Sequence, residues 1–393
     1  MEVFLFARLV SLAIFALVLM LICIFISNTN DKKRAAGYLT IYTVILTVMG
    51  YLFVPHSGAD LTRLWIVMHQ YAREDVMVFL QSLTSSLSPG VVLYYNIIGR
   101  LGNDHLLPAV SALITFSFCF AILHSLLKKE STGFSTTEIA IALFLFMSRG
   151  LMMQIISNIR TLMALSIAAW CIYQEFYNKR STKKLIIPYL LAASLHAMGI
   201  IIVLYRIAYS FIDQRGTRLQ KINRWVLGFS AAAAVLLFGW KYILRVINKG
   251  FNYIRETQSG EGYFYLWEFI LCVMTLMVLL YVIHFFRRAY RYNRNSGSAD
   301  DLSHATNQLL RYLTPLIIIE FIAIPLEFST FQRINWYFTI LLLPLTVCTL
   351  REVKLVSPAH AKVFRNNLLI AATAILFLAC ARGDLCSLKF FGG

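Results

Sequence analysis

Long apolar runs, each close to the length of a bilayer crossing, alternate with short polar segments along nearly the whole chain. A helix needs about 20 consecutive apolar residues to cross roughly 30 Å of hydrocarbon. Only helices and closed barrels satisfy their backbone groups there, and these runs lack the alternation of barrel strands. The pattern therefore predicts an all-α polytopic integral membrane protein with a single transmembrane domain over residues 1–393.

The apolar runs predict about ten transmembrane helices. We expect them at residues 3–27, 37–54, 106–127, 138–156, 161–177, 225–244, 263–285, 309–326, 335–350 and 367–381. The first run is too long for a signal-peptide core, and its basic cluster follows it, so we interpret it as a span. Interfacial or re-entrant helices add to this set, and a GT-C-like architecture is compatible with it.

Two segments do not fit as ordinary spans. Residues 55–104 are predicted to form an outer-face loop with an interfacial helix at residues 88–102. Residues 185–205 have strongly basic segments on both sides, which favours a re-entrant hairpin with His196 near its tip. Irregular backbone at that depth has to line a protein cavity. One straight span, with one loop departing from the charge rule, is the alternative.

Charge gives the predicted orientation. The chain has 36 Lys and Arg residues against 19 Asp and Glu residues, and most of the surplus lies in short loops. The positive-inside rule places these loops in the cytoplasm, residues 286–308 among them, and places both termini on the outer side. In a soluble protein such a charge would suggest nucleic acid. We expect no nucleic-acid partner, because no basic helix with base-stacking aromatics lies clear of a span.

Cofactor motifs are missing from the sequence. The seven cysteines are scattered, mostly within spans, and form no CxxC pair. This excludes a disulfide framework and a zinc-type spacing. There is also no phosphate-binding P-loop, no dinucleotide-binding glycine motif, and no HExxH or DxD motif. We therefore expect no metal, no cofactor, and chemistry that is independent of nucleotides.

Four polar residues are predicted to share the outer face. Asp60 follows the second span, Arg160 opens the fifth, His196 lies at the hairpin tip, and Arg333 precedes the ninth. Positive charge there runs against the topological trend, and a guanidinium is well suited to bind a pyrophosphate through two hydrogen bonds. The alternatives are structural: an arginine anchored among lipid headgroups, a hydrogen-bonded packing histidine, and an aspartate that caps a helix.

Two further residues have open interpretations. Glu320 lies inside the eighth predicted span, where a carboxylate needs a partner or a proton. It is first a structural partner, which could pair with an arginine, and alternatively a proton relay in a transporter. Tyr253 lies in the predicted external loop 245–262 and is either an aromatic of the membrane interface or a platform for a sugar.

Short motifs give the chain a family resemblance. The stretches Ser157–Leu165 and Leu191–Ile200 resemble the EpsG family, which is related to the Wzy-type polysaccharide polymerases. Arg160, Ala164, the Lys183-Lys184 turn and His196 match its pattern. Gly58-Ala59-Asp60 resembles the family's Gly-x-Asp, and Arg333 to Phe338 resembles its late Arg-x-x-x-Tyr-Phe. The chain departs from the family at Leu61 and Thr161, usually Tyr and Gln, and it lacks an arginine shortly before Gly58.

The resemblance implies a polymerase of O-antigen, capsule or exopolysaccharide units on the outer face of a bacterial inner membrane. Such an enzyme joins oligosaccharides carried on undecaprenyl pyrophosphate. Arg160 and Arg333 would stabilise the leaving group, and His196, or else Asp60, would be the general base. The candidate substrate contacts are Arg63, Asn158, Tyr253, Arg333 and Tyr337. Implied partners are the lipid-linked oligosaccharide, membrane lipid and a chain-length regulator protein.

Three other functions remain open. The first is a transporter or flippase for a lipid-linked glycan, although no internal repeat is visible in the sequence. The second is a membrane acyltransferase that modifies surface polysaccharide, and the third is a ligase that attaches a finished glycan to another acceptor.

Overall fold

The computed structural model describes residues 2–55, 60–129, 134–212, 262–326 and 328–381. Within these ranges all regular structure is helical, with one short 3-10 turn at Thr182–Leu185. The α-helices are α1 (Glu2–Asn28), α2 (Lys32–Leu52), α3 (Asp60–Arg73), α4 (Val76–Ser85), α5 (Pro89–Arg100), α6 (Leu106–Leu127), α7 (Thr136–Ser148), α8 (Leu151–Ser157), α9 (Ile159–Tyr177), α10 (Ile186–Leu195), α11 (Ala197–Ile212), α13 (Gly262–Asn295), α14 (Asp301–Leu326), α15 (Phe328–Val356) and α16 (Pro358–Ala381).

Six of the described helices, α1, α2, α6, α13, α14 and α16, are long and apolar enough to cross a membrane. Helices α4, α7 and α11 are apolar but shorter. The all-helical class is therefore confirmed, and the long apolar helices agree with a polytopic membrane protein. The total of about ten spans stays a prediction. The predicted span 225–244 and Tyr253 lie outside the described residues.

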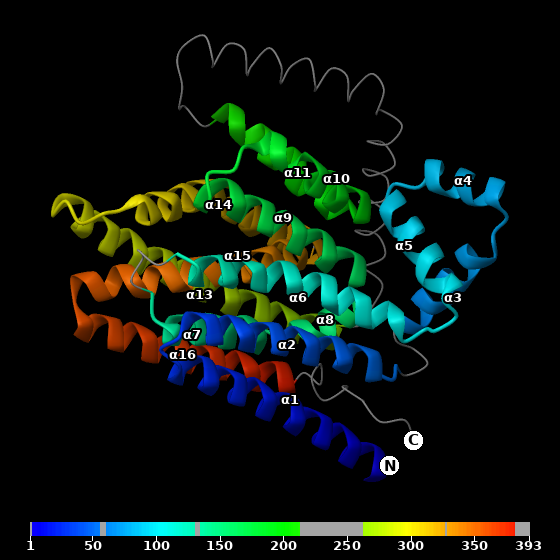
Figure 1. Cartoon of the computed structure of the whole chain (residues 1–393), viewed down its shortest axis with the longest axis horizontal. Helices are drawn as coiled ribbons and strands as arrows, with labels where there is room; N and C mark the ends of the chain where they lie inside the picture. Colours follow the sequence, from blue (N-terminus) through cyan, green and yellow to red (C-terminus); the bar gives the residue numbers. More distant parts are fainter. Residues whose placement is uncertain (1, 56–59, 130–133, 213–261, 327, 382–393) are drawn as a thin grey trace.

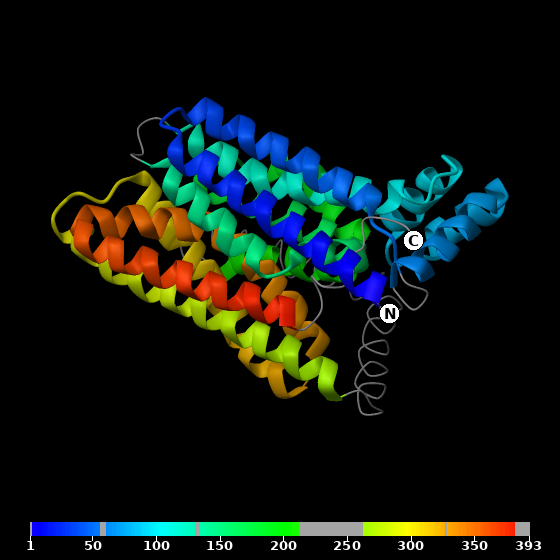
Figure 2. The same ribbon diagram turned by 90° about the horizontal axis from the view of Figure 1, so that it is seen from below.

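The long helices lie side by side in one bundle with α9 at its centre (Figure 1, Figure 2). Helix α9 is buried along nearly its whole length and contacts α6, α10, α11, α14 and α15. Its buried small residues, Ala164, Ser166, Ala168 and Ala169, let neighbouring backbones come close. Close packing of this kind replaces the hydrophobic effect as the force that holds helices together in lipid.

One end of the bundle, which we call the basic end, carries residues 28–32, 128–129, 134–136, 178–185, 296–300 and 357, where helices begin or end (Figure 1). Direct contacts join these segments. Lys32 Nζ donates to the carbonyl of Lys129 at 3.4 Å, Lys129 Nζ donates to the carbonyl of Tyr177 at 2.6 Å, and Lys179 pairs with Asp301 at 2.8 Å. Among the residues that the structure describes, these loops predicted to be cytoplasmic therefore share one end, and their side of the membrane stays a prediction.

A closed polar network ties three helices together at the basic end. Arg351 donates to both carboxylate oxygens of Asp300, at 3.2 and 2.5 Å, and to Glu352 at 3.2 Å. Ser303 donates to Glu352 at 2.5 Å and to Asp300 at 2.8 Å, and Asn293 donates to Glu352 at 2.9 Å. Because both carboxylates and the guanidinium are bonded, this network locks α13, α14 and α15 in register.

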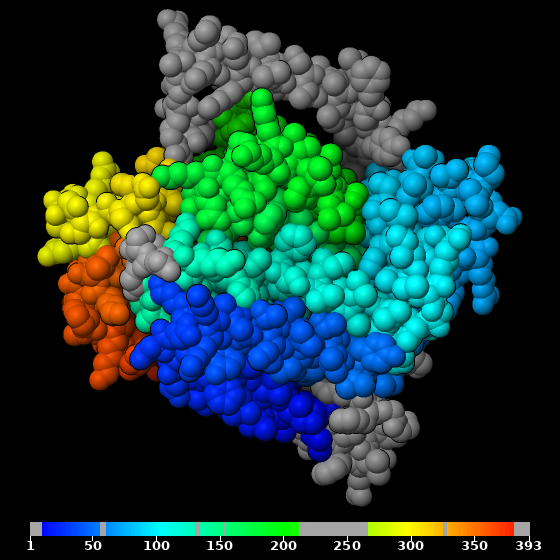
Figure 3. All heavy atoms as spheres, viewed as in Figure 1, coloured from blue at the N-terminus to red at the C-terminus, as the bar shows by residue number. Residues whose placement is uncertain are grey.

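The opposite end carries α3, α4 and α5, which stand out from the bundle as a lobe (Figure 3). Helices α3 and α5 pack tightly, because Gly99 leaves room for Met68 and Ala72, and Asn96 donates to the carbonyl of Tyr71 at 2.6 Å. Helix α4 has no buried side chain, and Met77 is 77% exposed. The segment 55–104 thus contains three helices, of which α5 coincides with the predicted helix 88–102. Its place at a membrane interface stays a prediction.

Two predicted boundaries differ from the structure. The span predicted at residues 138–156 is broken, because α7 ends at Ser148 and α8 begins at Leu151. Gly150 makes the break with a φ of 72°, a conformation that glycine adopts without steric cost. At the basic end α13 continues to Asn295 and α14 starts at Asp301, so only residues 296–300 of the predicted loop 286–308 lie outside a helix.

Helices α10 and α11 pack against each other and are separated by the extended backbone of His196. A Cβ on Gly199 would collide with the carbonyl oxygen of Ala192, so the backbones of the two helices are in direct contact at this point. Far from this turn, Arg206 on α11 pairs with Glu175 of α9 at 2.5 Å. Residues 185–205 therefore form two antiparallel helices that begin and end near the basic end (Figure 1). Re-entry into a bilayer stays a prediction.

The tight turn predicts opposite effects of two glycine substitutions. Gly199→Ala should lower the free energy of unfolding by about 1–3 kcal/mol, because the new methyl group meets fixed backbone. Gly37→Ala is the matched control, since Gly37 lies in α2 with nothing near its Cβ position. It should raise the free energy of unfolding by about 0.4–1 kcal/mol. Unfolding in detergent, followed by tryptophan fluorescence, measures both. Equal stability of the two variants would contradict the close approach.

The polar network predicts a stability loss in acid. Burial raises the pKa of Asp300, but hydrogen bonds from Arg351 and Ser303 outweigh it and lower this pKa to about 2. A carboxylate with a depressed pKa stabilises the fold above its unfolded pKa, here near 3.8, and this contribution disappears as pH falls towards 2. Asp300→Asn should therefore flatten the fall in unfolding temperature between about pH 4 and pH 2. An unchanged pH profile in this variant would exclude the network as its cause.

Candidate functional site

Helix α5 connects two of the residues predicted to act in catalysis. At its first turn, Gly90 packs so closely on Ser194 that a Cβ there would overlap the Ser194 hydroxyl. Ser194 comes two residues before His196. In the middle of α5, burial raises the pKa of Tyr95 to about 12, and the neighbouring positive charge of Arg160 partly offsets this. His196 and Arg160 therefore lie beside successive parts of the same helix.

Asp60 lies towards the other end of α5. Helix α3 runs antiparallel to α5, since Met68 packs on Gly99 while the Trp65 ring lies 5.9 Å from His105, beyond the end of α5. Asp60, at the start of α3, is thus displaced towards the Arg100 end. The 12 residues of α5 span about 18 Å. Asp60 and His196 consequently flank the helix at its two ends, and Arg160 lies between them.

The carboxylate of Asp60 forms an ion pair with Arg63 one turn along α3. Both side chains are well exposed, with 44% and 77% of their surface accessible. An exposed pair of this kind adds little to stability. Asp60 is therefore an accessible carboxylate, and the Arg63 guanidinium lies beside it.

The hydrogen bond at Nδ1 of His196 favours one tautomer. Its Nδ1 accepts a hydrogen bond from the backbone N–H of Met198 at 3.1 Å and so caps the first turn of α11. A neutral imidazole that accepts at Nδ1 carries its proton on Nε2. His196 is half-buried, and in this state it offers a donor rather than a lone pair. The capping role matches the structural interpretation of this residue, and a hydrogen bond from Nε2 to a phosphate oxygen is compatible with it.

Arg160 is exposed in the first turn of α9, a 19-residue helix. A cation at a helix N-terminus is opposed by the positive end of the macrodipole. The helix dipole therefore does not stabilise the charge of Arg160. The N-terminus of α9 and the guanidinium together attract an anion. Asn158 precedes this turn, and its amide donates to Gln154 Oε1 at 3.1 Å. The joint between α8 and α9 is the most suitable place for a pyrophosphate among the predicted residues.

The interior of the bundle contains a buried polar cluster that the sequence pattern did not predict, formed by Arg149, Glu268, Cys272, Glu320 and Asn335. Arg149 Nη2 donates to Glu268 Oε1 at 2.5 Å and to Cys272 Sγ at 3.3 Å, and both charged side chains are 1% exposed. Asn335 donates to Glu320 Oε1 at 3.1 Å and to the carbonyl of Cys272 at 2.9 Å. The cluster joins the α7–α8 break to α13, α14 and α15. Glu320 is thus bonded to an amide, in agreement with its interpretation as a structural partner.

The sequence carried a signal for this cluster. Arg149 lies inside the predicted span 138–156 and Glu268 inside the predicted span 263–285, and a charge within a span needs a partner. The pairing itself could not be read from the sequence, because 119 positions separate the two residues. Arg149 Nε and Nη1 have no hydrogen-bond partner among the described residues.

Two predicted substrate contacts lie on α15. Arg333 is half-buried and lies two residues before Asn335. Tyr337 is fully buried, and its hydroxyl lies 3.2 Å from the hydroxyl of Tyr312. Tyr312 packs in turn on Tyr205 of α11. The substrate-binding roles of Arg333 and Tyr337 stay predictions.

No group of three or more His, Cys, Asp or Glu side chains within the described ranges could hold a metal ion. The model of the EpsG family matches residues 74–378, most of the chain. The match includes Arg149, Arg160, His196 and Arg333 and begins after Asp60 and Arg63. No curated protein and no solved structure matches the chain.

The buried pair of Arg149 and Glu268 predicts strong coupling between two substitutions. Arg149→Met and Glu268→Leu should each lower the free energy of unfolding by about 3–5 kcal/mol, because each leaves one buried charge uncompensated. The double variant should be more stable than either single variant. A double-mutant cycle, measured by unfolding in detergent, gives the coupling energy. Additive losses, or single variants as stable as the wild type, would contradict the ion pair.

Proposed function

The chain belongs to the EpsG family, and on this premise we propose that it is a membrane glycosyltransferase that polymerises polysaccharide. In this proposal it transfers oligosaccharide repeat units from undecaprenyl pyrophosphate onto another lipid-linked glycan at the outer face of the inner membrane. The observation that carries the proposal is the family match over residues 74–378. The membrane-spanning helices and the exposed arginine at the start of α9 support it.

The proposed reaction is a direct displacement. A hydroxyl oxygen of the acceptor sugar bonds to the anomeric carbon of the donor while the bond from that carbon to the pyrophosphate oxygen breaks. The electron pair leaves with undecaprenyl pyrophosphate, the hydroxyl proton passes to a base, and the anomeric configuration inverts. The donor brings its own leaving group, so the reaction as proposed requires neither a nucleotide nor a metal.

We assign the leaving group to the joint between α8 and α9. Arg160 and the N-terminus of α9 would stabilise the charge that develops on the pyrophosphate, and such stabilisation is usually the largest contribution to catalysis. His196 would donate from Nε2 to the same group. Nδ1 of His196 is already bonded to Met198. Asp60, the second candidate base, would then take the proton from the acceptor hydroxyl.

This assignment gives the substrate a direction along α5. The pyrophosphate lies at the middle of α5 near Tyr95, the polyprenyl chain runs towards the hairpin of α10 and α11, and the sugars extend towards Asp60. A ligase would use the same chemistry but would transfer a finished glycan once. A transporter would move the lipid-linked glycan without elongating it. The products therefore distinguish these functions.

Elongation is the direct assay. Purified protein supplied with lipid-linked repeat units should produce a ladder of longer glycans. Arg160→Ala should lower the rate of elongation by about 10²–10³-fold, the usual loss when one donor to a developing anion is removed. Arg160→Lys should fall in between, because it keeps the charge but loses the two-bond geometry. Arg73→Ala is the matched control, since Arg73 is exposed and lies outside the family match.

The outcomes separate the site from the function. A ladder that persists unchanged in Arg160→Ala would refute the assigned site and leave the polymerase proposal standing. No ladder from the wild type, together with passage of the same lipid across liposomes, would refute the polymerase proposal in favour of transport. A single product on a different acceptor would favour a ligase.

A further inference from the structure

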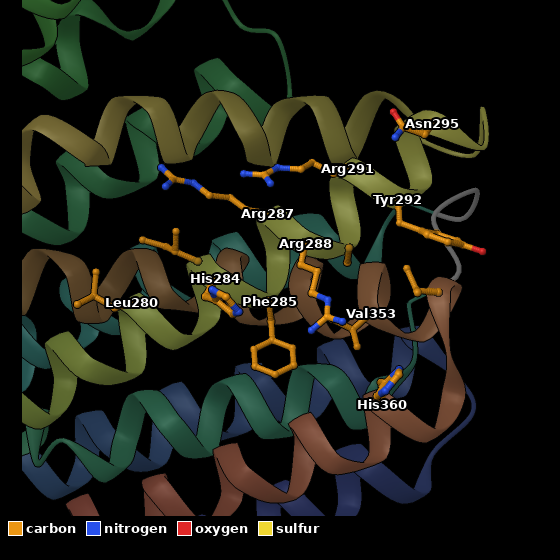
Figure 4. Close-up of a pocket in the computed structure, with 13 residues that line it drawn as sticks. Leu280, His284, Phe285, Arg287, Arg288, Arg291, Tyr292, Asn295, Val353 and His360 are labelled. Atoms are coloured by element: carbon orange, nitrogen blue, oxygen red, sulfur yellow. The ribbon is translucent and has the colours of Figure 1, made fainter.

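A cavity of about 900 Å³ opens at the basic end, remote from α5 and Arg160. It lies between the second half of α13, the end of α15 and the start of α16 (Figure 4). Nothing in the proposed reaction uses this part of the molecule. Its lining changes from apolar to basic along α13, and this change indicates the kind of ligand that would fit.

One part of the cavity is strongly basic. Arg287, Arg288 and Arg291 line it from less than two turns of α13, and His360 lines it from α16 (Figure 4). No Asp or Glu is among the lining residues. Arg287 donates to the Thr314 hydroxyl at 3.3 Å, while Arg288 and Arg291 form no ion pair within the described part of the chain. All three arginines are exposed.

The nearest carboxylates do not neutralise these arginines. Asp300 and Glu352 lie at the same end, but both are bonded to Arg351 in the closed network. Ser303 donates to the Glu352 oxygen that also accepts from Arg351, and Asn293 donates to the other Glu352 oxygen. The positive charge that faces the cavity is therefore unbalanced by the protein, which favours an anionic ligand.

The other part of the cavity is apolar. Leu280, Ile283, Phe285, Val353 and Val356 line it. The lining runs from Leu280 to Asn295 on α13, which corresponds to about 22 Å at 1.5 Å per residue. Leu280 is also 39% exposed, on the apolar stretch of a helix long enough to cross a membrane. The cavity thus extends from the depth of hydrocarbon to the depth of headgroups.

We propose that this cavity binds an anionic phospholipid, with its phosphate bound by the exposed arginines Arg288 and Arg291 and an acyl chain along Leu280 and Ile283. Guanidinium groups bind phosphate oxygens through paired, charge-assisted hydrogen bonds. Basic pockets between membrane helices bind anionic headgroups in the same way. A free phosphate would use only the basic half, whereas a phospholipid fills both halves. The bound lipid would connect α13 to α16.

The test measures lipid retention by native mass spectrometry of the purified full chain. Phosphatidylglycerol is titrated against phosphatidylcholine with identical acyl chains, and inorganic phosphate serves as the soluble probe. Phosphatidylglycerol should bind at least tenfold more tightly than phosphatidylcholine. Arg288→Gln combined with Arg291→Gln should weaken its binding by about 25-fold, from about fivefold for each arginine near a membrane surface. Leu280→Gln should weaken phosphatidylglycerol binding and leave phosphate binding unchanged.

The matched control combines Arg294→Gln with Lys362→Gln, which removes two exposed charges near the same end without changing the cavity lining. Its binding of phosphatidylglycerol should equal that of the wild type. Equal weakening in the control would show general surface attraction and overturn the proposal. Equal binding of the two lipids, or displacement of the lipid by inorganic phosphate at matched concentration, would overturn it as well. If the double arginine variant does not fold, the wild-type lipid comparison and Leu280→Gln decide.

Discussion

The ion pair of Arg149 and Glu268 lies where several helices meet, with both side chains almost completely shielded from solvent. A charge in such a place has to be matched, because leaving it alone costs several kcal/mol. Matching it requires α7 to stop at Ser148 and turn through Gly150, so that the guanidinium enters the interior beside α13. The same turn creates α8, and the joint after α8 starts α9 with Arg160 exposed. The buried pair and the exposed arginine are therefore consequences of one break.

Charged side chains are paired differently at the two ends of the bundle. At the basic end, Arg351 is matched by Asp300 and Glu352, and the network holds three helices together. Arg288 and Arg291, which line the nearby cavity, do not belong to that network and are exposed. At the other end, Arg160 sits at a helix N-terminus, which repels it. Within the described ranges neither Arg160 nor these two arginines form an ion pair, which supports the two proposed anionic ligands, a lipid headgroup at one end and a pyrophosphate at the other.

The sequence predicted what depends on local pattern. Helix α6 has the bounds 106–127 expected from its apolar run, and the backbone turns at His196, where basic flanks on both sides had suggested a hairpin. It could not predict what depends on distant partners. The break at Gly150 places Arg149 against a partner that lies 119 positions away in the sequence. Helix α4 was not predicted, because its ten residues have no buried side chain and therefore lack the periodic core face that identifies a helix.

The placement of α5 and Arg160 on the outer face, opposite the basic end, is tested most directly by cysteine labelling in intact cells. The natural cysteines are replaced, and single cysteines are introduced at two exposed positions, Gln81→Cys on α4 and Ser298→Cys between α13 and α14. An impermeant maleimide should label the Gln81→Cys chain in intact cells and the Ser298→Cys chain only after the membrane is opened. The reverse pattern would put α5 in the cytoplasm and contradict polymerisation at the outer face.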